Sequence, residues 1–198
     1  MLLGLASSTL LSSITATALA QQGPSAVETP PAANYWKSFA LGCGVSILAH
    51  ETAHILTSFA VGAHPYIAFS KGRPTVYSGI DSDRHPHKQF LFSSAGLVTQ
   101  SLINEAILDI PHSGGGAIER GILAGGIGTT LFYITLGRNG SVSDISVMAR
   151  TSSLSKTQLS LIFGGVSAIQ AWRISRDPRY QHFFLRPTAN GAVFGFSY

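Results

Sequence analysis

His50, Glu51 and His54 form an H-E-x-x-H motif, completed by Thr52 and Ala53. On a helix, two histidines four positions apart lie on one face, so both imidazoles can bind the same metal ion. The glutamate beside them can accept a proton from a water molecule that the metal activates. The motif therefore predicts a metalloprotease with Zn²⁺ as its cofactor, His50 and His54 as metal ligands, and Glu51 as the catalytic base.

A catalytic zinc ion needs a third protein ligand, and two carboxylates are candidates. Asp144 directly follows an apolar stretch, whereas Glu105 lies inside another one. The segment 104–109, Asn-Glu-Ala-Ile-Leu-Asp, resembles the N-E-x-x-x-D helix of thermolysin-like enzymes, in which the Glu binds zinc. We favour Asp144 as the third ligand and keep Glu105 as the alternative.

The composition is that of a membrane protein. Charged residues make up only 11% of the 198 residues, hydrophobic residues make up 45%, and a soluble domain carries about a quarter charged residues. The net charge of +4 is spread over short loops and the tail, so no nucleic-acid partner is expected. A single cysteine, Cys43, excludes an internal disulfide and a cysteine-based zinc cluster.

Four apolar stretches follow one another along the chain. The first two are long enough to cross a bilayer, and the first contains the H-E-x-x-H motif. We expect a mainly α fold, a polytopic membrane helical bundle of about three to four spans, with a short β-hairpin between the first two core helices. The alternative, a soluble helical core, lacks the polar outer faces that it would need. The stretches cover about residues 38–61, 90–110, 121–136 and 159–174.

The two ends of the chain have their own patterns. Residues 1–20 are apolar and end in Ala-Leu-Ala, which predicts a signal peptide, with a first membrane anchor as the alternative. Residues 21–37 are expected to be a proline-containing linker, 38–176 a membrane metalloprotease-like domain, and 177–198 an extended C-terminal tail with a possible edge strand. We expect an integral protein of the bacterial inner membrane, in contact with the lipid bilayer.

Residues 38–148 resemble the site-2 protease family of intramembrane zinc metalloproteases. In that family the H-E-x-x-H motif lies on the first core transmembrane helix and a membrane-associated hairpin follows. The second core helix opens with a Gly-Pro-x-x-Asn-type signature, and a third helix carries an Asn and then an Asp that completes the zinc site. The resemblance implies a helical membrane protein as the substrate.

Two parts of this pattern differ from the family. Residues 95–100 occupy the signature position, with Leu97 where proline is usual and Gln100 where asparagine is usual. Asn139 and Asp144 match the Asn and Asp of the third helix, but the proline before this Asp and the glycine after it are absent. The resemblance implies that Asn139 or Gln100 steadies the oxyanion or the substrate strand.

We therefore predict a zinc-dependent intramembrane endopeptidase that hydrolyses peptide bonds of membrane-protein or peptide substrates. Two alternatives remain open. The departures around Asp144 favour a non-catalytic, metal-binding membrane protein with a protease-like fold. The Glu105 segment favours a thermolysin-like metallopeptidase instead. The pair His85 and His87 is expected in an interfacial loop rather than in a di-iron site, which needs further histidine clusters.

Overall fold

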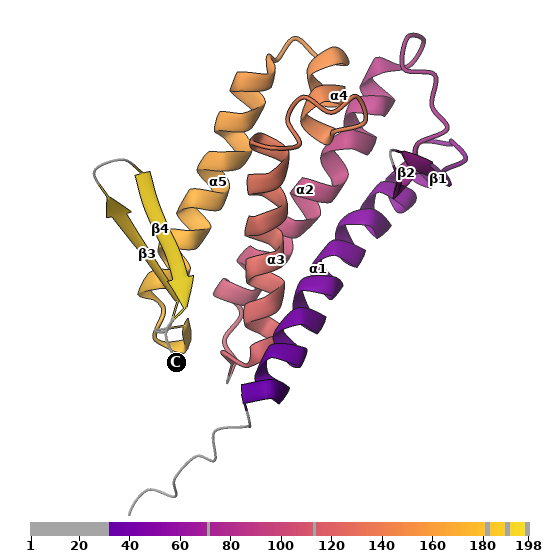
Figure 1. Cartoon of the computed structure of the whole chain (residues 1–198). Helices are drawn as coiled ribbons and strands as arrows, with labels where there is room; N and C mark the ends of the chain where they lie inside the picture. Colours follow the sequence, from indigo (N-terminus) through magenta and orange to yellow (C-terminus); the bar gives the residue numbers. More distant parts are fainter. Residues whose placement is uncertain (1–31, 71, 113, 181–182, 189–190, 197–198) are drawn as a thin grey trace, which may run out of the picture. The chain divides into compact units, whose positions relative to one another are not determined.

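The computed structural model describes residues 32–70, 72–112, 114–180, 183–188 and 191–196 (Figure 1). It confirms the mainly helical fold with a small antiparallel hairpin after the first helix. Within the described residues, one helix, over Asn34–Ala60, combines the length and the apolar composition that crossing a membrane requires. The helices are α1 (Ala32–Ala60), α2 (Pro86–Asp109), α3 (Ala117–Ile134), α4 (Asp144–Arg150) and α5 (Lys156–Arg176).

Local sequence signals account for several helix ends. Pro86 occupies the first turn of α2, where its missing N–H is not needed, and Pro111 follows shortly after the end of this helix. Ser155 and Gln158 form a capping box that begins α5, each side chain bonding the backbone N–H of the other residue. These residues therefore mark the beginning and the end of α2 and the beginning of α5.

The hairpin between α1 and α2 consists of β1 (Tyr66–Ser70) and β2 (Arg73–Tyr77). The strands are antiparallel, with Tyr66 opposite Tyr77, and Gly72 in the turn has a φ of 77°, which favours glycine. The hairpin lies where it was predicted, between the first two long helices.

Helices α1 and α3 lie side by side with their backbones in close contact (Figure 1). A Cβ atom on Gly42 would lie 2.0 Å from the Ile118 carbonyl oxygen, and one on Gly121 would lie 2.1 Å from that of Phe39. Only glycine leaves room for this approach, as at tight helix crossings in membrane proteins. The crossing fixes α3 against the helix that carries the H-E-x-x-H motif.

Two apolar clusters complete the packing. One joins α2, α3, α5 and the short 3₁₀ helix η1 (Pro178–Tyr180), and the other joins α2, α4 and α5. The second cluster places the beginning of α4 against the middle of α2. Its buried members are Leu97, Ile145, Met148 and Leu159.

Several boundaries differ from those expected. α1 begins at Ala32, so the last residues of the predicted linker are already helical, because no proline follows Pro31 until residue 65. The short helix α4 was not predicted. The C-terminal segment contains its own antiparallel hairpin, β3 (Phe183–Thr188) with β4 (Gly191–Phe196), rather than one edge strand. The predicted signal peptide and residues 21–31 lie outside the described residues.

Candidate metal centre

His50 and His54 lie one turn apart on α1 and are almost completely buried. Their rings are in contact, and the two Nε2 atoms are 3.1 Å apart. Burial of two imidazoles is costly unless every ring nitrogen has a partner. The partners of all four nitrogens therefore define what this pair can bind.

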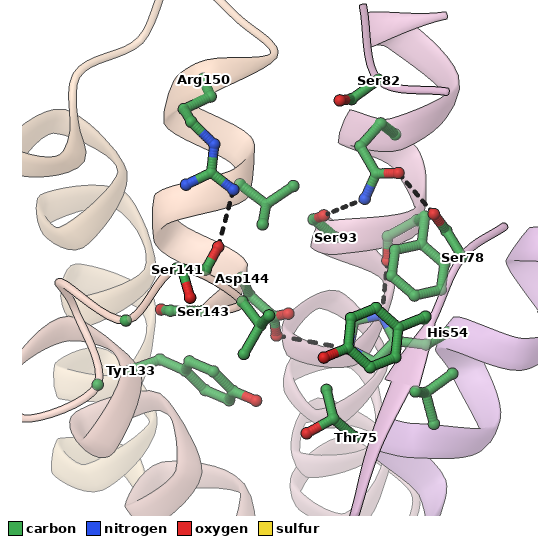
Figure 2. Close-up of a pocket in the computed structure, with 18 of the residues that line it drawn as sticks. His54, Thr75, Ser78, Ser82, Ser93, Tyr133, Ser141, Ser143, Asp144 and Arg150 are labelled. Atoms are coloured by element: carbon green, nitrogen blue, oxygen red, sulfur yellow. Dashed lines mark hydrogen bonds and ion pairs between the residues drawn. The ribbon is translucent and has the colours of Figure 1, made fainter. Parts of the chain in front are cut away.

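Asp144, the first residue of α4, brings a buried carboxylate to the two histidines. Its Oδ2 atom is 3.1 Å from Nε2 of His50 and 3.4 Å from Nε2 of His54. Figure 2 shows the Asp144 side chain pointing toward His54. The structure thus brings together the two motif histidines and the favoured carboxylate, three groups that together could hold a metal ion.

The spacing of the three atoms fits a tetrahedral metal ion. Zinc bonds of about 2.0–2.2 Å at tetrahedral angles place neighbouring ligand atoms about 3.4 Å apart. The three ligand atoms here are separated by 3.1, 3.1 and 3.4 Å. A donor set of two imidazoles and one carboxylate also leaves the fourth position open, as catalytic zinc sites require.

Gln100 on α2 determines which nitrogen of His50 carries the proton. Its Oε1 accepts a hydrogen bond from Nδ1 of His50 at 3.0 Å. Its Nε2 donates to the carbonyl and the hydroxyl of Ser46, at 3.2 and 3.0 Å, and to Thr129 on α3. Because the carbonyl of Ser46 can only accept, the Gln100 oxygen must face His50, and Nε2 of His50 keeps its lone pair for a metal.

A backbone carbonyl does the same for His54. Nδ1 of His54 donates to the carbonyl of Phe92 at 2.6 Å, so its Nε2 also carries the lone pair. Oδ2 of Asp144 faces both Nε2 atoms, at 3.1 and 3.4 Å, so its carboxylate supplies the third electron pair. Three electron-pair donors therefore converge on one point, an arrangement that a cation stabilises.

Gly96 on α2 makes room for the His50 ring. A Cβ atom at this position would lie 2.4 to 2.6 Å from three atoms of the imidazole. Any side chain here must displace the ring, since such contacts are far shorter than van der Waals distance. The glycine of the predicted signature position is therefore explained by the His50 ring that packs against it.

Glu51 lines a cavity of about 700 Å³ together with His54 and Asp144. Its side chain is half-buried, and no described residue donates a hydrogen bond to its carboxylate or forms an ion pair with it. The cavity is also lined by β2, by the loop before α4 and by Tyr133 of α3. Glu51 thus shares this cavity with two of the three candidate metal ligands.

The alternative third ligand, Glu105, does not lie at this site. Its carboxylate pairs with Arg173 and accepts a hydrogen bond from Gln170 at 3.0 Å, both on α5. Glu105 follows Gly96 by nine residues, or about 14 Å along the helix. The structure does not bring Glu105 together with the two histidines, because α2 carries it away toward α5.

The two residues expected to contact substrate lie elsewhere. Gln100 is buried behind His50, and the Asn139 side chain accepts a hydrogen bond from Lys156 at 3.3 Å on the exposed side of its loop. Neither residue lines the cavity. Their positions therefore give no support to the substrate role that the family resemblance implied, and they give Gln100 the role of orienting His50.

Sequence reasoning missed Tyr133, whose ring stacks on His50 with centroids 5.5 Å apart and an interplanar angle of 10°. It also missed the Phe92 carbonyl, since any residue provides one. No spacing rule connects a lone tyrosine on one helix to a histidine on another, so only the packing of α3 against α1 reveals this contact.

No protein-family model, curated protein or solved structure matches this chain. The candidate metal centre is therefore defined by its own geometry: the Nε2 atoms of His50 and His54 and the Oδ2 atom of Asp144. What it does must be inferred from this donor set, from Glu51 and from the cavity.

Proposed function

We propose that this protein is a zinc-dependent intramembrane endopeptidase that hydrolyses peptide bonds of membrane-protein substrates. The observation that carries the proposal is the convergence of three buried ligand atoms beside a cavity that Glu51 also lines. Two histidines and one carboxylate, with an adjoining glutamate and an open fourth position, form the donor set of a hydrolytic zinc site.

The chemistry divides between the metal and Glu51. Zinc, when bound, would polarise the scissile carbonyl and lower the pKa of the attacking water. Glu51 accepts a proton from that water as its oxygen bonds to the carbonyl carbon. It then gives the proton to the amide nitrogen as the C–N bond breaks, which leaves one carboxylate and one amine. Gln100 and the Phe92 carbonyl keep both imidazoles in the metal-binding orientation throughout.

The surface of the helices supports a membrane location. Large apolar side chains on α1, α2, α3 and α5 are exposed, and a soluble protein rarely exposes so many. At 1.5 Å per residue, α2 and α5 are about 36 and 32 Å long and α3 about 27 Å, close to the thickness of a bilayer core. Exposed examples on the four helices are Leu48, Leu56, Leu102, Leu131, Leu161 and Ile169.

The site lies near one end of α1, which suggests how water enters. His54 precedes the last residue of α1 by six positions, or about 9 Å. Polar residues from the loops at this end, including Ser82, Asp83 and Ser141, line the cavity with the motif. A peptide bond close to the membrane surface would therefore meet both Glu51 and water.

Substitution of Glu51 tests this proposal. The full chain is reconstituted in lipid nanodiscs with Zn²⁺ and assayed on fluorogenic transmembrane peptides. Glu51→Gln should keep one zinc ion per chain but lose about 10²- to 10⁴-fold in cleavage rate, since it removes the base alone. Asp144→Asn should lose zinc itself. Zinc is quantified by mass spectrometry after dialysis.

The same pair of variants separates the proposal from a non-catalytic protein. If Glu51→Gln and the unaltered protein bind zinc equally and neither cleaves above background, the metal site serves binding or structure. If Asp144→Asn keeps its zinc, the metal centre itself is wrongly assigned. Glu105→Gln is the matched carboxylate control. Glu105 pairs with Arg173 of α5 and does not contact the two histidines, so this variant should retain zinc.

A further inference from the structure

Basic side chains gather at the end of the bundle where α3 ends and α5 begins (Figure 1). Between residues 137 and 160 the charged residues are Asp144 and three cations, Arg138, Arg150 and Lys156. Asp144 is buried and faces the two histidines. Arg150 is exposed, and Arg138 and Lys156 are half-buried. The accessible charge of this segment is therefore entirely positive.

Arg138 and Lys156 lie close together, although one belongs to the loop after α3 and the other begins α5. Nη2 of Arg138 donates to the Thr157 hydroxyl at 2.6 Å. Nζ of Lys156 donates to the side-chain oxygen of Asn139 at 3.3 Å. These two hydrogen bonds hold residues 138 and 139 beside the first two residues of α5. Both acceptors are neutral, so neither bond balances the positive charge of its donor.

The missing counter-charge distinguishes this pair from other arginines of the protein. Three arginines form ion pairs with carboxylates: Arg84 with Asp81, Arg173 with Glu105, and Arg179 with Asp177. By contrast, no carboxylate of the described residues forms an ion pair with Arg138 or Lys156. Their like charges repel each other, and both would stabilise an anion that lies between them.

Exposed apolar side chains flank the two cations. Leu136, two residues before Arg138, is 87% exposed, and Leu161 of α5 is 70% exposed. Leu161 follows Lys156 by five residues, or about 7.5 Å along the helix. A soluble anion needs the cations but gains nothing from the leucines. An anionic lipid matches both, because its head group carries the charge and its acyl chains cover apolar surface.

We propose, on the basis of the proposed bilayer location, that Arg138 and Lys156 bind the phosphate group of an anionic phospholipid whose acyl chains lie along Leu161. The bond to Thr157 uses one of the five N–H donors of the guanidinium, and the bond to Asn139 uses one of the three of the ammonium. The remaining donors can bond to phosphate oxygens. Neither cation lines the cavity, so this binding does not depend on peptidase chemistry.

The test is lipid binding by the full chain in a non-ionic detergent, measured by native mass spectrometry. Short-chain phosphatidylglycerol, which is anionic, is compared with phosphatidylcholine of the same chain length, which has no net charge. We expect one tightly bound phosphatidylglycerol per chain and at least about tenfold weaker binding of phosphatidylcholine. Arg138→Gln combined with Lys156→Gln should weaken phosphatidylglycerol binding about 25-fold, since each basic side chain near an anionic surface contributes about fivefold.

Two further double variants control for net charge and for folding. Arg84→Gln with Lys88→Gln removes the same two types of cation, but Arg84 already pairs with Asp81 and Lys88 donates to the Val61 carbonyl at 2.8 Å. This variant should bind phosphatidylglycerol within about twofold of the unaltered protein. Arg138→Lys with Lys156→Arg keeps both charges and should keep binding within a few-fold, which separates loss of charge from loss of fold.

Equal affinity for the two lipids would overturn the lipid site and leave the bilayer location standing. So would an equal loss of phosphatidylglycerol binding in the two glutamine double variants, or an equal loss when the two charges are exchanged. Glycerol phosphate carries the phosphate without acyl chains. If it binds as tightly as phosphatidylglycerol, the site takes a soluble phosphate and the lipid assignment is wrong. Release of the protein from membranes by alkaline carbonate would overturn the lipid site and the bilayer location together.

Discussion

The two histidines of the candidate metal centre are held by acceptors of different kinds. His50 donates to a side-chain amide, Gln100, which is itself fixed by Ser46 and Thr129. His54 donates to a backbone carbonyl of α2. Both partners are buried, and both leave Nε2 free to bind a metal. Such outer-shell partners commonly change metal affinity by 10- to 100-fold when they are removed.

Gln100→Leu should therefore weaken zinc binding about 10- to 100-fold while His50 and His54 remain in place. Leucine cannot accept a hydrogen bond from Nδ1 of His50, so the imidazole loses its fixed orientation and its Nδ1–H is left buried without a partner. Competition with a fluorescent zinc chelator measures the change. Ser101→Ala is the control, because the Ser101 hydroxyl bonds only within its own helix, to the Leu97 carbonyl. Equal affinities in the two variants would contradict the orienting role.

Spacing predicted some residues of the site and could not predict others. His50 and His54 follow from an i, i+4 pattern, and Glu51 lies between them. The sequence left Asp144 and Glu105 as alternative third ligands, because it does not show which carboxylate the fold brings close to the two histidines. Gln100 was predicted near the site, but its hydrogen bond to His50 was not, since a partner behind a ligand has no sequence spacing of its own.

At the scale of elements, close backbone contacts set the geometry. α2 passes His50 at Gly96, and α3 passes α1 at Gly42 and Gly121. Each contact leaves no space for a Cβ atom, so the backbones approach as closely as glycine allows. Such close packing helps to hold the three convergent ligand atoms in a fixed geometry.

Gly96→Ala should disturb the metal site without touching a ligand. The added methyl must displace the His50 ring, and overpacking of this kind costs about 1–3 kcal/mol. We expect a lower thermal midpoint and at least a tenfold loss of zinc affinity. Gly128→Ala is the control, because no atom lies within 4 Å of its Cβ position on α3. There alanine should stabilise the helix by about 0.5–1 kcal/mol. Equal behaviour of the two variants would show that His50 tolerates the methyl.

The apolar stretches predicted the long helices, but they did not predict the exact helix ends or the short helix α4. α3 begins four residues before its predicted stretch and ends two residues before the stretch does, whereas α5 extends beyond its stretch at both ends. Polar residues such as Glu119, Lys156 and Arg176 belong to these helices, although they lie outside the apolar stretches. α4 begins with the candidate ligand Asp144 and has only seven residues, so the helix is too short to show a periodic pattern. Its place depends on burial of Ile145 and Met148 against Leu97, which is a tertiary contact.

For the molecule as a whole, a polar junction ties the ends of three segments together. Arg179 of η1 donates to the carbonyls of Ile107 and Leu108 in the last turn of α2 and pairs with Asp177. His112, in the loop before α3, donates to the Ile110 carbonyl and bonds Glu119 of α3 at 2.9 Å. The junction therefore links α2, α3 and the segment after α5.

This junction should make stability depend on pH. The hydrogen bonds to Glu119 and the Ile110 carbonyl raise the pKa of His112 above its ordinary 6.5, against the opposing charge of Arg179. A raised pKa in the folded state means that the stabilisation is complete below pH 6.5 and is lost as pH rises through the folded-state pKa. Thermal unfolding in detergent between pH 5.5 and 8.5 should show this decline, and Glu119→Gln should flatten it. Parallel curves for the two proteins would contradict the assignment.

A membrane location predicts how the whole protein fractionates. The full chain should remain in the membrane pellet after alkaline carbonate washing and should dissolve only with detergent, because its exposed apolar helices need a hydrocarbon environment. A protein released by carbonate would contradict the proposed bilayer location. Immunoblotting of pellet and supernatant is sufficient to decide this.

The hydrogen bond from His54 to the Phe92 carbonyl has a genetic consequence. A codon change at position 92 alters the ring that packs on His54, but every non-deleted residue still supplies a carbonyl there. Position 100 offers no such protection, since a single-nucleotide change can replace glutamine with a residue that cannot accept a hydrogen bond from His50. A saturation library scored for zinc retention should therefore tolerate many residues at 92 and few at 100.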